Sequence, residues 1–273
     1  MEVQGAVVVV TGAARGIGKA IAQAFADVGA SVALVDILSD ELRQTASDLA
    51  AAGTRVMPFV TDTTDVGQVQ SLADRVGAEL GPVDVLVNNA GTFSIIAPVW
   101  EADPERWFRD IRVNLYGSFL CARAFVAGMV RRQRGCVINI VSTGGVGDRH
   151  PYCTSYASSK AGLMRLTEGL AAEVRDHGVK VFALAPPAVL TDMTRLIMED
   201  AGGQQWRPGF SRIFEEGRGA PPELIAERAV ELASGKADAL TGRYLPAAGD
   251  WEALIAQAEA IIADDRLTLR LRL

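Results

Sequence analysis

The chain has 273 residues, and 49% of them are hydrophobic, which suits one large α/β domain with a substantial core. A formal net charge of −6 excludes the basic surface that nucleic acids require. The first residues show no charged leader before an apolar core, and apolar runs such as Ala6–Val10 are too short to span a bilayer. Three cysteines without paired spacing (Cys121, Cys136 and Cys153) predict reduced thiols in a cytoplasmic protein without a metal site.

Strand-like and helix-like segments then alternate. Short apolar runs predict buried strands, and apolar residues every three to four positions predict helices. The expected strands are Ala6–Val10, Ser31–Val35, Arg55–Val60, Val83–Val87, Cys136–Val141 and Lys180–Ala185. The expected helices are Gly16–Val28, Asp40–Ala52, Asp65–Leu80, one beginning at Asp103-Pro104, one from about Asn114 to Arg132, and Tyr156–Asp176. This alternation predicts an α/β fold: a doubly wound parallel sheet of the Rossmann type, with helices on both faces, in a single domain.

A glycine-rich turn separates the first expected strand from the first helix. Its sequence is Thr11-Gly12-Ala13-Ala14-Arg15-Gly16-Ile17-Gly18. Glycines there permit a tight turn and let the backbone approach a pyrophosphate at the positive end of the helix. We therefore expect this turn to bind a dinucleotide through Gly12, Arg15, Gly16, Ile17 and Gly18; a glycine turn without a ligand is the alternative.

Polar and small residues follow the next three expected strands. Asp36, eighteen residues after Gly18, is placed to accept hydrogen bonds from ribose hydroxyls and to repel the 2′-phosphate of NADP. This favours NAD over NADP, although Arg15 offers a possible phosphate contact. Asp62 is expected to reach the adenine amino group. The segment Asn89, Ala90 and Gly91 is expected to leave room for the cofactor, and a structural role for its asparagine is the alternative.

Tyr156 and Lys160 are i,i+4 neighbours on one face of an expected helix. A nearby ammonium favours the phenolate and so lowers the pKa of a tyrosine from its ordinary value of about 10. A tyrosine adjusted in this way can exchange a proton with an alcohol or carbonyl oxygen. On spacing alone, the pair is also typical of a solvated helix face.

Taken together, these motifs resemble the short-chain dehydrogenase/reductase family, in its compact single-domain branch, over about residues 5–192. The matching pieces are Thr11–Gly18, Asp62, Asn88–Gly91, Asn114, Ser142, Tyr156 with Lys160, and the segment from Pro186 to Thr191. The resemblance implies that Tyr156 is the general acid/base and that Lys160 lowers its pKa and holds the nicotinamide ribose. It also implies that Ser142 binds the substrate oxygen and that Asn114 holds a relay water.

The resemblance further places Pro186, Val189 and Thr191 beside the nicotinamide. Pro187 stands where the family typically has glycine, and the substitution could shape the substrate pocket. Residues 193–219 are expected to form a lid over that pocket. The residues expected to line it are Gly144, His150, Cys153, Pro187, Trp206 and Phe210. The hydrophobic lid favours an apolar alcohol or ketone as substrate.

The C-terminal region departs from the family pattern. We expect residues 1–249 to form the dinucleotide-binding domain and residues 250–273 to add a helix and an apolar tail. A helical stripe runs through Trp251, Leu254, Ile255, Ala258, Ile261 and Ile262. Leucines then alternate from Leu267 to Leu273, which predicts a strand. This region packs on its own domain or on a neighbouring subunit, and family members are usually homotetramers or dimers.

The sequence therefore predicts an NAD-dependent oxidoreductase that interconverts a secondary alcohol and a ketone. A catalytically silent NAD-binding regulatory protein is one alternative, and an NADPH-preferring ketoreductase of the 3-oxoacyl reductase type is another. Lyases and epimerases on this fold usually have a larger substrate domain than the chain after Thr191 provides. No nucleic-acid or membrane partner is expected.

Overall fold

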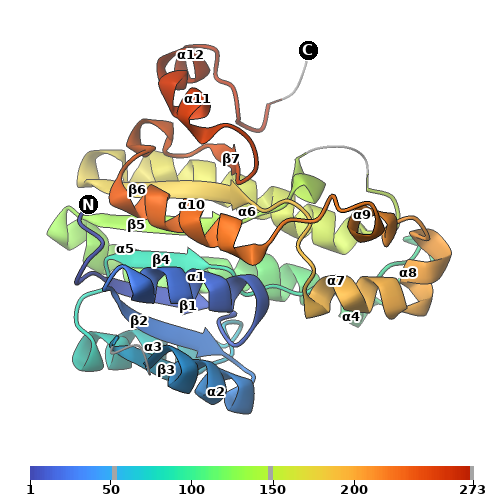
Figure 1. Ribbon diagram of the computed structural model, residues 1–273, viewed down its shortest axis with the longest axis horizontal. Helices are drawn as coiled ribbons and strands as arrows, with labels where there is room; N and C mark the ends of the chain where they lie inside the picture. The colour runs from blue at the N-terminus through green and yellow to red at the C-terminus, as the bar shows by residue number, and fades with distance from the viewer. Residues whose placement is uncertain (51–53, 147–149, 271–273) are drawn as a thin grey trace.

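The computed structural model describes residues 1–50, 54–146 and 150–270, and a seven-stranded parallel sheet forms its centre (Figure 1). The strand order is β3-β2-β1-β4-β5-β6-β7. The strands are β1 (Val7–Thr11), β2 (Ser31–Asp36), β3 (Val56–Val60), β4 (Val85–Asn88), β5 (Gly135–Ile140), β6 (Val179–Ala185) and β7 (Tyr244–Pro246). The order reverses direction between β1 and β4, so the predicted doubly wound Rossmann fold is confirmed.

Helices cover both faces of the sheet (Figure 1). One face packs against α1 (Gly16–Asp27), α2 (Ser39–Ala50) and α10 (Pro222–Ser234). The other packs against α3 (Val66–Glu79), α5 (Ser118–Arg132) and α6 (Thr154–Glu173). Within β1, Val8 and Val10 join the first apolar cluster, whereas Val7 and Val9 join the second. Burial on both faces explains why the strands read as continuous apolar runs.

The long helix predicted from Asn114 begins differently. Helix α4 (Pro104–Ile111) continues through a π-helical turn, η1 (Arg112–Gly117), directly into α5. Asp103 caps α4 by accepting from Arg106 N at 2.8 Å, as the Asp-Pro signal predicts. The expectation that no segment spans a membrane rested only on short apolar runs. The continuous stretch Pro104–Arg132 is long and apolar enough to cross a membrane by length and composition. Half of its most apolar window, however, is buried inside the fold, as in the core helix of a soluble protein.

Three short helices follow β6 and lie beyond the carboxyl ends of the strands (Figure 1). They are α7 (Asp192–Glu199), α8 (Ala201–Trp206) and α9 (Arg212–Glu215). This is the stretch predicted as a lid, and it stands at the edge where open α/β sheets bind ligands. The end of the second predicted helix, at residues 51–53, lies outside the described residues.

The C-terminal region packs on its own domain. In place of one helix it forms α11 (Trp251–Ala256) and α12 (Ala258–Ala263). Trp251 and Ile261 are both buried in the same apolar cluster as β6, β7 and α10. The Trp251 indole also donates to Pro246 O at 2.8 Å, so the helices close the β7 edge of the core.

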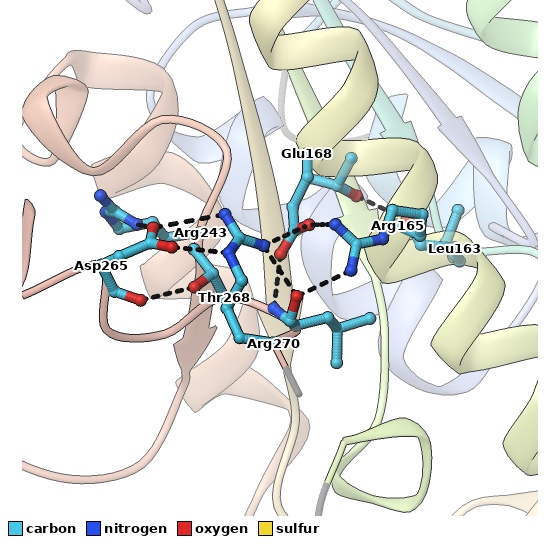
Figure 2. Close-up of polar contacts among 9 residues, drawn as sticks. Leu163, Arg165, Glu168, Arg243, Asp265, Thr268 and Arg270 are labelled. Carbon is cyan, nitrogen blue, oxygen red and sulfur yellow. Dashed lines mark hydrogen bonds and ion pairs between the residues drawn. The ribbon is translucent and has the colours of Figure 1, made fainter. Parts of the chain in front are cut away.

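The strand predicted after these helices is wrong. Leu267 has a φ of 60°, which is incompatible with a strand, and its side chain and that of Leu269 enter two separate apolar clusters. An ion pair between Arg270 and Glu168 holds this segment against α6 (Figure 2). Glu168 accepts from Leu269 N at 2.6 Å, and Arg270 pairs with both Glu168 and Asp265. Residues 271–273 lie outside the described part of the chain.

Candidate active site

A cavity of about 630 Å³ opens at the carboxyl edge of the sheet. Loops that are far apart in sequence meet there, because parallel strands end at the same edge. It brings together most of the predicted cofactor residues. Those lining it are Gly12, Arg15, Gly16, Ile17, Gly18, Asp36, Asp62, Asn89, Ala90, Gly91, Tyr156, Lys160, Pro186 and Thr191.

The glycine turn forms a close-fitting cradle. Gly12 and Gly16 have φ values of 67° and 56°, which favour glycine. A Cβ on Gly18 would lie 2.0 Å from Gly12 O, so only glycine lets α1 approach β1 this closely. The first turn of α1 contains no acidic residue and no side-chain cap. Its backbone N–H groups therefore suit a pyrophosphate, and the cradle fits a dinucleotide.

Asn89 has a structural role at this edge. Its Nδ2 donates to Thr11 O at 2.9 Å and to Gly12 O at 3.1 Å. Its backbone N–H and that of Ala90 both donate to the Thr11 hydroxyl oxygen, each at 3.0 Å. The side chain of Asn89 thus ties the β4 loop to the glycine turn, as the structural alternative proposed, while the residue still lines the cavity.

Asp36 and Asp62, the two acidic residues at the nucleotide end of the cavity, both accept hydrogen bonds from nearby loop residues. Asp36 Oδ2 accepts from Ala14 N at 3.0 Å, and Oδ1 accepts from Leu38 N at 3.1 Å. Asp62 Oδ1 accepts from both the N–H and the hydroxyl of Thr64 at 2.8 Å. Both carboxylates border the cavity, where they offer acceptors to a nucleoside.

Arg15 pairs with Asp192 of α7 at 2.9 Å, and both side chains are half exposed. The ion pair therefore joins the start of α1 to the first lid helix across the cavity. Exposed ion pairs contribute only about 0–1 kcal/mol, so this contact opens at little cost.

Tyr156 and Lys160 lie one turn apart on α6, with Lys160 Nζ 5.8 Å from the centroid of the phenol ring. Lys160 is 4% exposed, and its Nζ donates to Ile140 O at 2.8 Å. The Ser142 side chain acts on the phenol by lowering its pKa, and its hydroxyl accepts from Gly144 N at 3.1 Å. The structure thus brings together three of the four residues predicted to be catalytic.

The pKa values differ from the expectation that Lys160 lowers the pKa of Tyr156. Burial raises the pKa of the Tyr156 phenol, and the Ser142 hydrogen bond only partly opposes this. Burial also lowers the pKa of Lys160 to about 8, against the opposing influence of Asp110. Desolvation is the largest cause of both pKa shifts, because burial disfavours the charged form of each group.

Asn114, the fourth residue, is fully buried in the π-helical turn η1. Its Oδ1 accepts from Thr92 N at 2.7 Å, and its Nδ2 donates to Thr92 O and Ser159 Oγ, both at 2.9 Å. A Cβ on Gly91 would lie 3.2 Å from Asn114 Oδ1 and 3.7 Å from Lys160 Nζ, which places the two side chains near each other. The relay water stays a prediction.

The nicotinamide segment is only partly exposed to the cavity. Pro186 and Thr191 line it, whereas Val189 is buried and forms a β-bridge with Ala220. The Thr191 side chain caps α7 by accepting from Thr194 N. A contact of Val189 with the cofactor therefore stays a prediction.

The described lining of this cavity includes none of the six residues expected to line the substrate pocket. Cys153 is buried against Ile96 and Ile197, with Trp206 and Phe210 packed around them. Arg207 donates to Cys153 Sγ at 3.3 Å, which joins the lid to the loop before α6. Cys153, Trp206 and Phe210 thus pack behind Ile96 and Ile197 of the wall, and contact of any of the six predicted residues with substrate stays a prediction.

The wall of the cavity includes Met193, Leu196, Ile197 and Asp200 from the stretch predicted as a lid. It also includes residues that the sequence did not point to: Thr92, Phe93, Ser94, Ile95, Ile96, Arg106 and Arg109. The Phe93 ring stacks on Tyr156 with centroids 4.6 Å apart and an interplanar angle of 12°. The apolar run after Gly91 was the available signal for this wall.

The strand order, the glycine cradle and the pair of half-buried Tyr156 with buried Lys160 define a dinucleotide-binding α/β oxidoreductase. Residues 6–202 match the short chain dehydrogenase family, and the chain belongs to that family. It is therefore an NAD(P)-dependent oxidoreductase of the kind that acts on alcohols.

Similar proteins cover nearly the whole chain. D-threitol dehydrogenase of Mycolicibacterium smegmatis is 35% identical over 89% of this chain and 92% of its own length. The 3-oxoacyl-[acyl-carrier-protein] reductase of Thermotoga maritima is 34% identical over 90% of this chain and 97% of its own. A crystal structure of a gluconate 5-dehydrogenase from Burkholderia cenocepacia, in complex with NADP and tartrate, superposes with a TM-score of 0.78 at 30% identity, covering 89% of this chain and 93% of that one.

Proposed function

We propose that this protein interconverts a secondary alcohol and a ketone, with NAD as cofactor and Tyr156 as general acid/base. The observation that carries the proposal is the Tyr156 phenol under the influence of the Ser142 hydroxyl, with buried Lys160 one turn away on α6. Two hydroxyl groups at one point suit a single substrate oxygen, which must lose or gain a proton as its carbon changes oxidation state.

Each residue has a defined task in this mechanism. The turn around Gly16 and the start of α1 would hold the pyrophosphate, and Asp36 would accept from the ribose hydroxyls. The nicotinamide, when bound, supplies the hydride chemistry. Ser142 and Tyr156 hold the substrate oxygen, and Tyr156 takes its proton during oxidation or returns one during reduction. Lys160, held by Ile140 O, keeps a positive charge near the phenol.

NAD is favoured over NADP because the Asp36 carboxylate borders the nucleotide end of the cavity. A carboxylate there attracts ribose hydroxyls and repels a 2′-phosphate. The second candidate, an NADPH-preferring ketoreductase, draws support from the 3-oxoacyl reductase relative and from the NADP in the Burkholderia cenocepacia structure.

An apolar alcohol or ketone is the proposed substrate, because apolar side chains, among them Phe93, Ile96, Met193 and Leu196, line the wall beyond the glycine turn. We expect an alicyclic secondary alcohol to show a higher kcat/KM than threitol with NAD, measured as NADH absorbance. A 3-oxoacyl thioester with NADPH tests the ketoreductase candidate in the same panel. A preference for the polyol or the thioester would contradict the proposed substrate class.

A cytoplasmic homo-oligomer, dimer or tetramer, is the proposed assembly. Large apolar side chains lie exposed along α4 and its continuation, among them Phe108, Tyr116 and Phe119. Such exposure favours a contact with a second copy. Light scattering should give a mass about two or four times that of one chain. An unchanged mass after deletion of residues 250–273 would exclude the tail from that contact, and a monomeric full-length protein would contradict the assembly.

A further inference from the structure

Asp110, at the end of α4, is a fully buried carboxylate to which the proposed mechanism assigns no role. Its Oδ1 accepts from Ser94 N at 2.8 Å, and its Oδ2 accepts from the Ser155 hydroxyl at 2.6 Å. Burial raises the pKa of this carboxyl, and the two serines oppose the rise. An apolar side chain at such a position usually costs less than a buried carboxylate. The contribution of Asp110 therefore lies in the two segments that it joins.

Asn114, one turn further along the same helical stretch, joins the same two segments. Its side chain bonds Thr92 in the loop after β4 and Ser159 on α6. Asp110 and Asn114 thus form two parallel bridges, because residues four apart share one helix face. Each bridge runs from the loop after β4, across α4 or η1, to the helix that carries Tyr156.

The two bridges enclose the aromatic pair at the centre of the site. Phe93 follows Thr92 and precedes Ser94 in the bridged loop, and Tyr156 directly follows the bridged Ser155. The stacked rings of Phe93 and Tyr156, with centroids 4.6 Å apart, are therefore anchored through the residues next to them. A shift of either bridge would move a ring that carries or contacts the reacting hydroxyl.

The start of α6 depends on this external support. Cys153, at its N-cap, makes no side-chain cap hydrogen bond. Trp107 of α4 donates its indole N–H to Thr154 Oγ1 at 3.0 Å, and Asp110 holds the next residue, Ser155. Trp107 and Asp110 are three residues apart and so share a face of α4. That face takes the place of a local cap for the catalytic helix.

We propose that Asp110 is a positioning residue: by bridging Ser94 to Ser155, it fixes the Phe93 ring against Tyr156 and aims the Tyr156 hydroxyl at Ser142. This proposal rests on the proposed role of Tyr156 as general acid/base. Misplacement by about 1 Å can cost an enzyme on the order of 10²-fold in rate, so a bridge of this kind has a measurable effect.

Replacing Asp110 by alanine breaks the bridge. We expect D110A to lower kcat by about tenfold or more. The KM for NAD should stay within about twofold of wild type, because the glycine turn that holds the cofactor lies between β1 and α1, away from the bridge. D110N keeps an oxygen acceptor for Ser94 N and an amide that can donate to Ser155 Oγ. It should therefore recover kcat to within about threefold of wild type. Equal losses in D110A and D110N would overturn positioning by hydrogen bonds.

Asp103→Ala is the matched structural control, because it removes the cap of α4 without touching the bridge. It should lower the melting temperature and leave kcat unchanged; a loss of kcat like that of D110A would mean that general loosening of α4 explains both. Ser155→Ala breaks the same bridge from α6 and carries the test if D110A does not fold. The double variant D110A/S155A should be no slower than D110A, and multiplied losses would contradict a shared bridge.

Tyr156→Phe separates this inference from the proposed function. If Tyr156→Phe is inactive while D110A and S155A match wild type, the positioning role is refuted and the general acid/base role stands. If Tyr156→Phe keeps full activity, the proposed function itself fails.

Discussion

Substituting Tyr156 by phenylalanine is expected to reduce kcat by about 10²–10⁴-fold, the range typical of losing a general acid/base. The substitution removes only the hydroxyl, so the stack with Phe93 and the fold should persist. NAD should bind with little change, because the nucleotide end of the cavity is built from other residues. Steady-state kinetics on the best substrate of the panel, with NAD titrated by tryptophan fluorescence, would measure both.

Tyr116→Phe is the matched control, since Tyr116 is 40% exposed on the outer side of η1. It should retain full activity.

The proton-transfer role also sets the sign of the pH dependence of the reaction. Burial raises the pKa of Tyr156, so it is protonated at neutral pH and favours ketone reduction, whereas alcohol oxidation needs the phenolate and should rise with pH. Full activity in Tyr156→Phe, or pH profiles of the opposite sign, would contradict the mechanism.

Substituting Asp36 by alanine is expected to weaken NAD binding by about 10–100-fold and to reduce the discrimination against NADP. Hydrogen bonds to a charged group contribute about 1.5–3 kcal/mol, which corresponds to that range. The same substitution removes the negative charge that would repel a 2′-phosphate. Calorimetric titration of both nucleotides into wild type and variant would measure the change.

Asp36→Asn distinguishes the two contributions. It can still accept from Ala14 N or Leu38 N, so the turn should stay intact while the charge is lost. Asp40→Ala removes a carboxylate from the first turn of α2 and serves as the control, with unchanged binding expected. If wild type bound NADP more tightly than NAD, the proposed cofactor preference would be wrong and the ketoreductase candidate would gain support.

The fold and the nucleotide half of the site could be read from the sequence because their signals are local. A strand buried on both faces must be apolar along its whole length, and β1 is. Gly18 must be glycine because its helix touches the Gly12 carbonyl. The i,i+4 spacing of Tyr156 and Lys160 requires only that their segment be helical.

The tail shows where local pattern failed. Alternating leucines from Leu267 predicted a strand, but Leu267 and Leu269 instead pack against two different apolar clusters, and Glu168 of α6 holds Leu269 N. A period of two records only that alternate side chains point in different directions. It does not require a neighbouring strand with which to pair.

The sequence by itself determined which residues can carry the chemistry: the glycine turn, Asp36, and Ser142 with Tyr156 and Lys160. Only the tertiary structure decided their environment. Burial of Lys160, the Phe93 stack on Tyr156 and the Asp110 bridge all arise where the β4 loop, α4 and α6 converge. Desolvation and these long-range contacts depend on which segments meet in space, and that information is not contained in the spacing of residues along one segment.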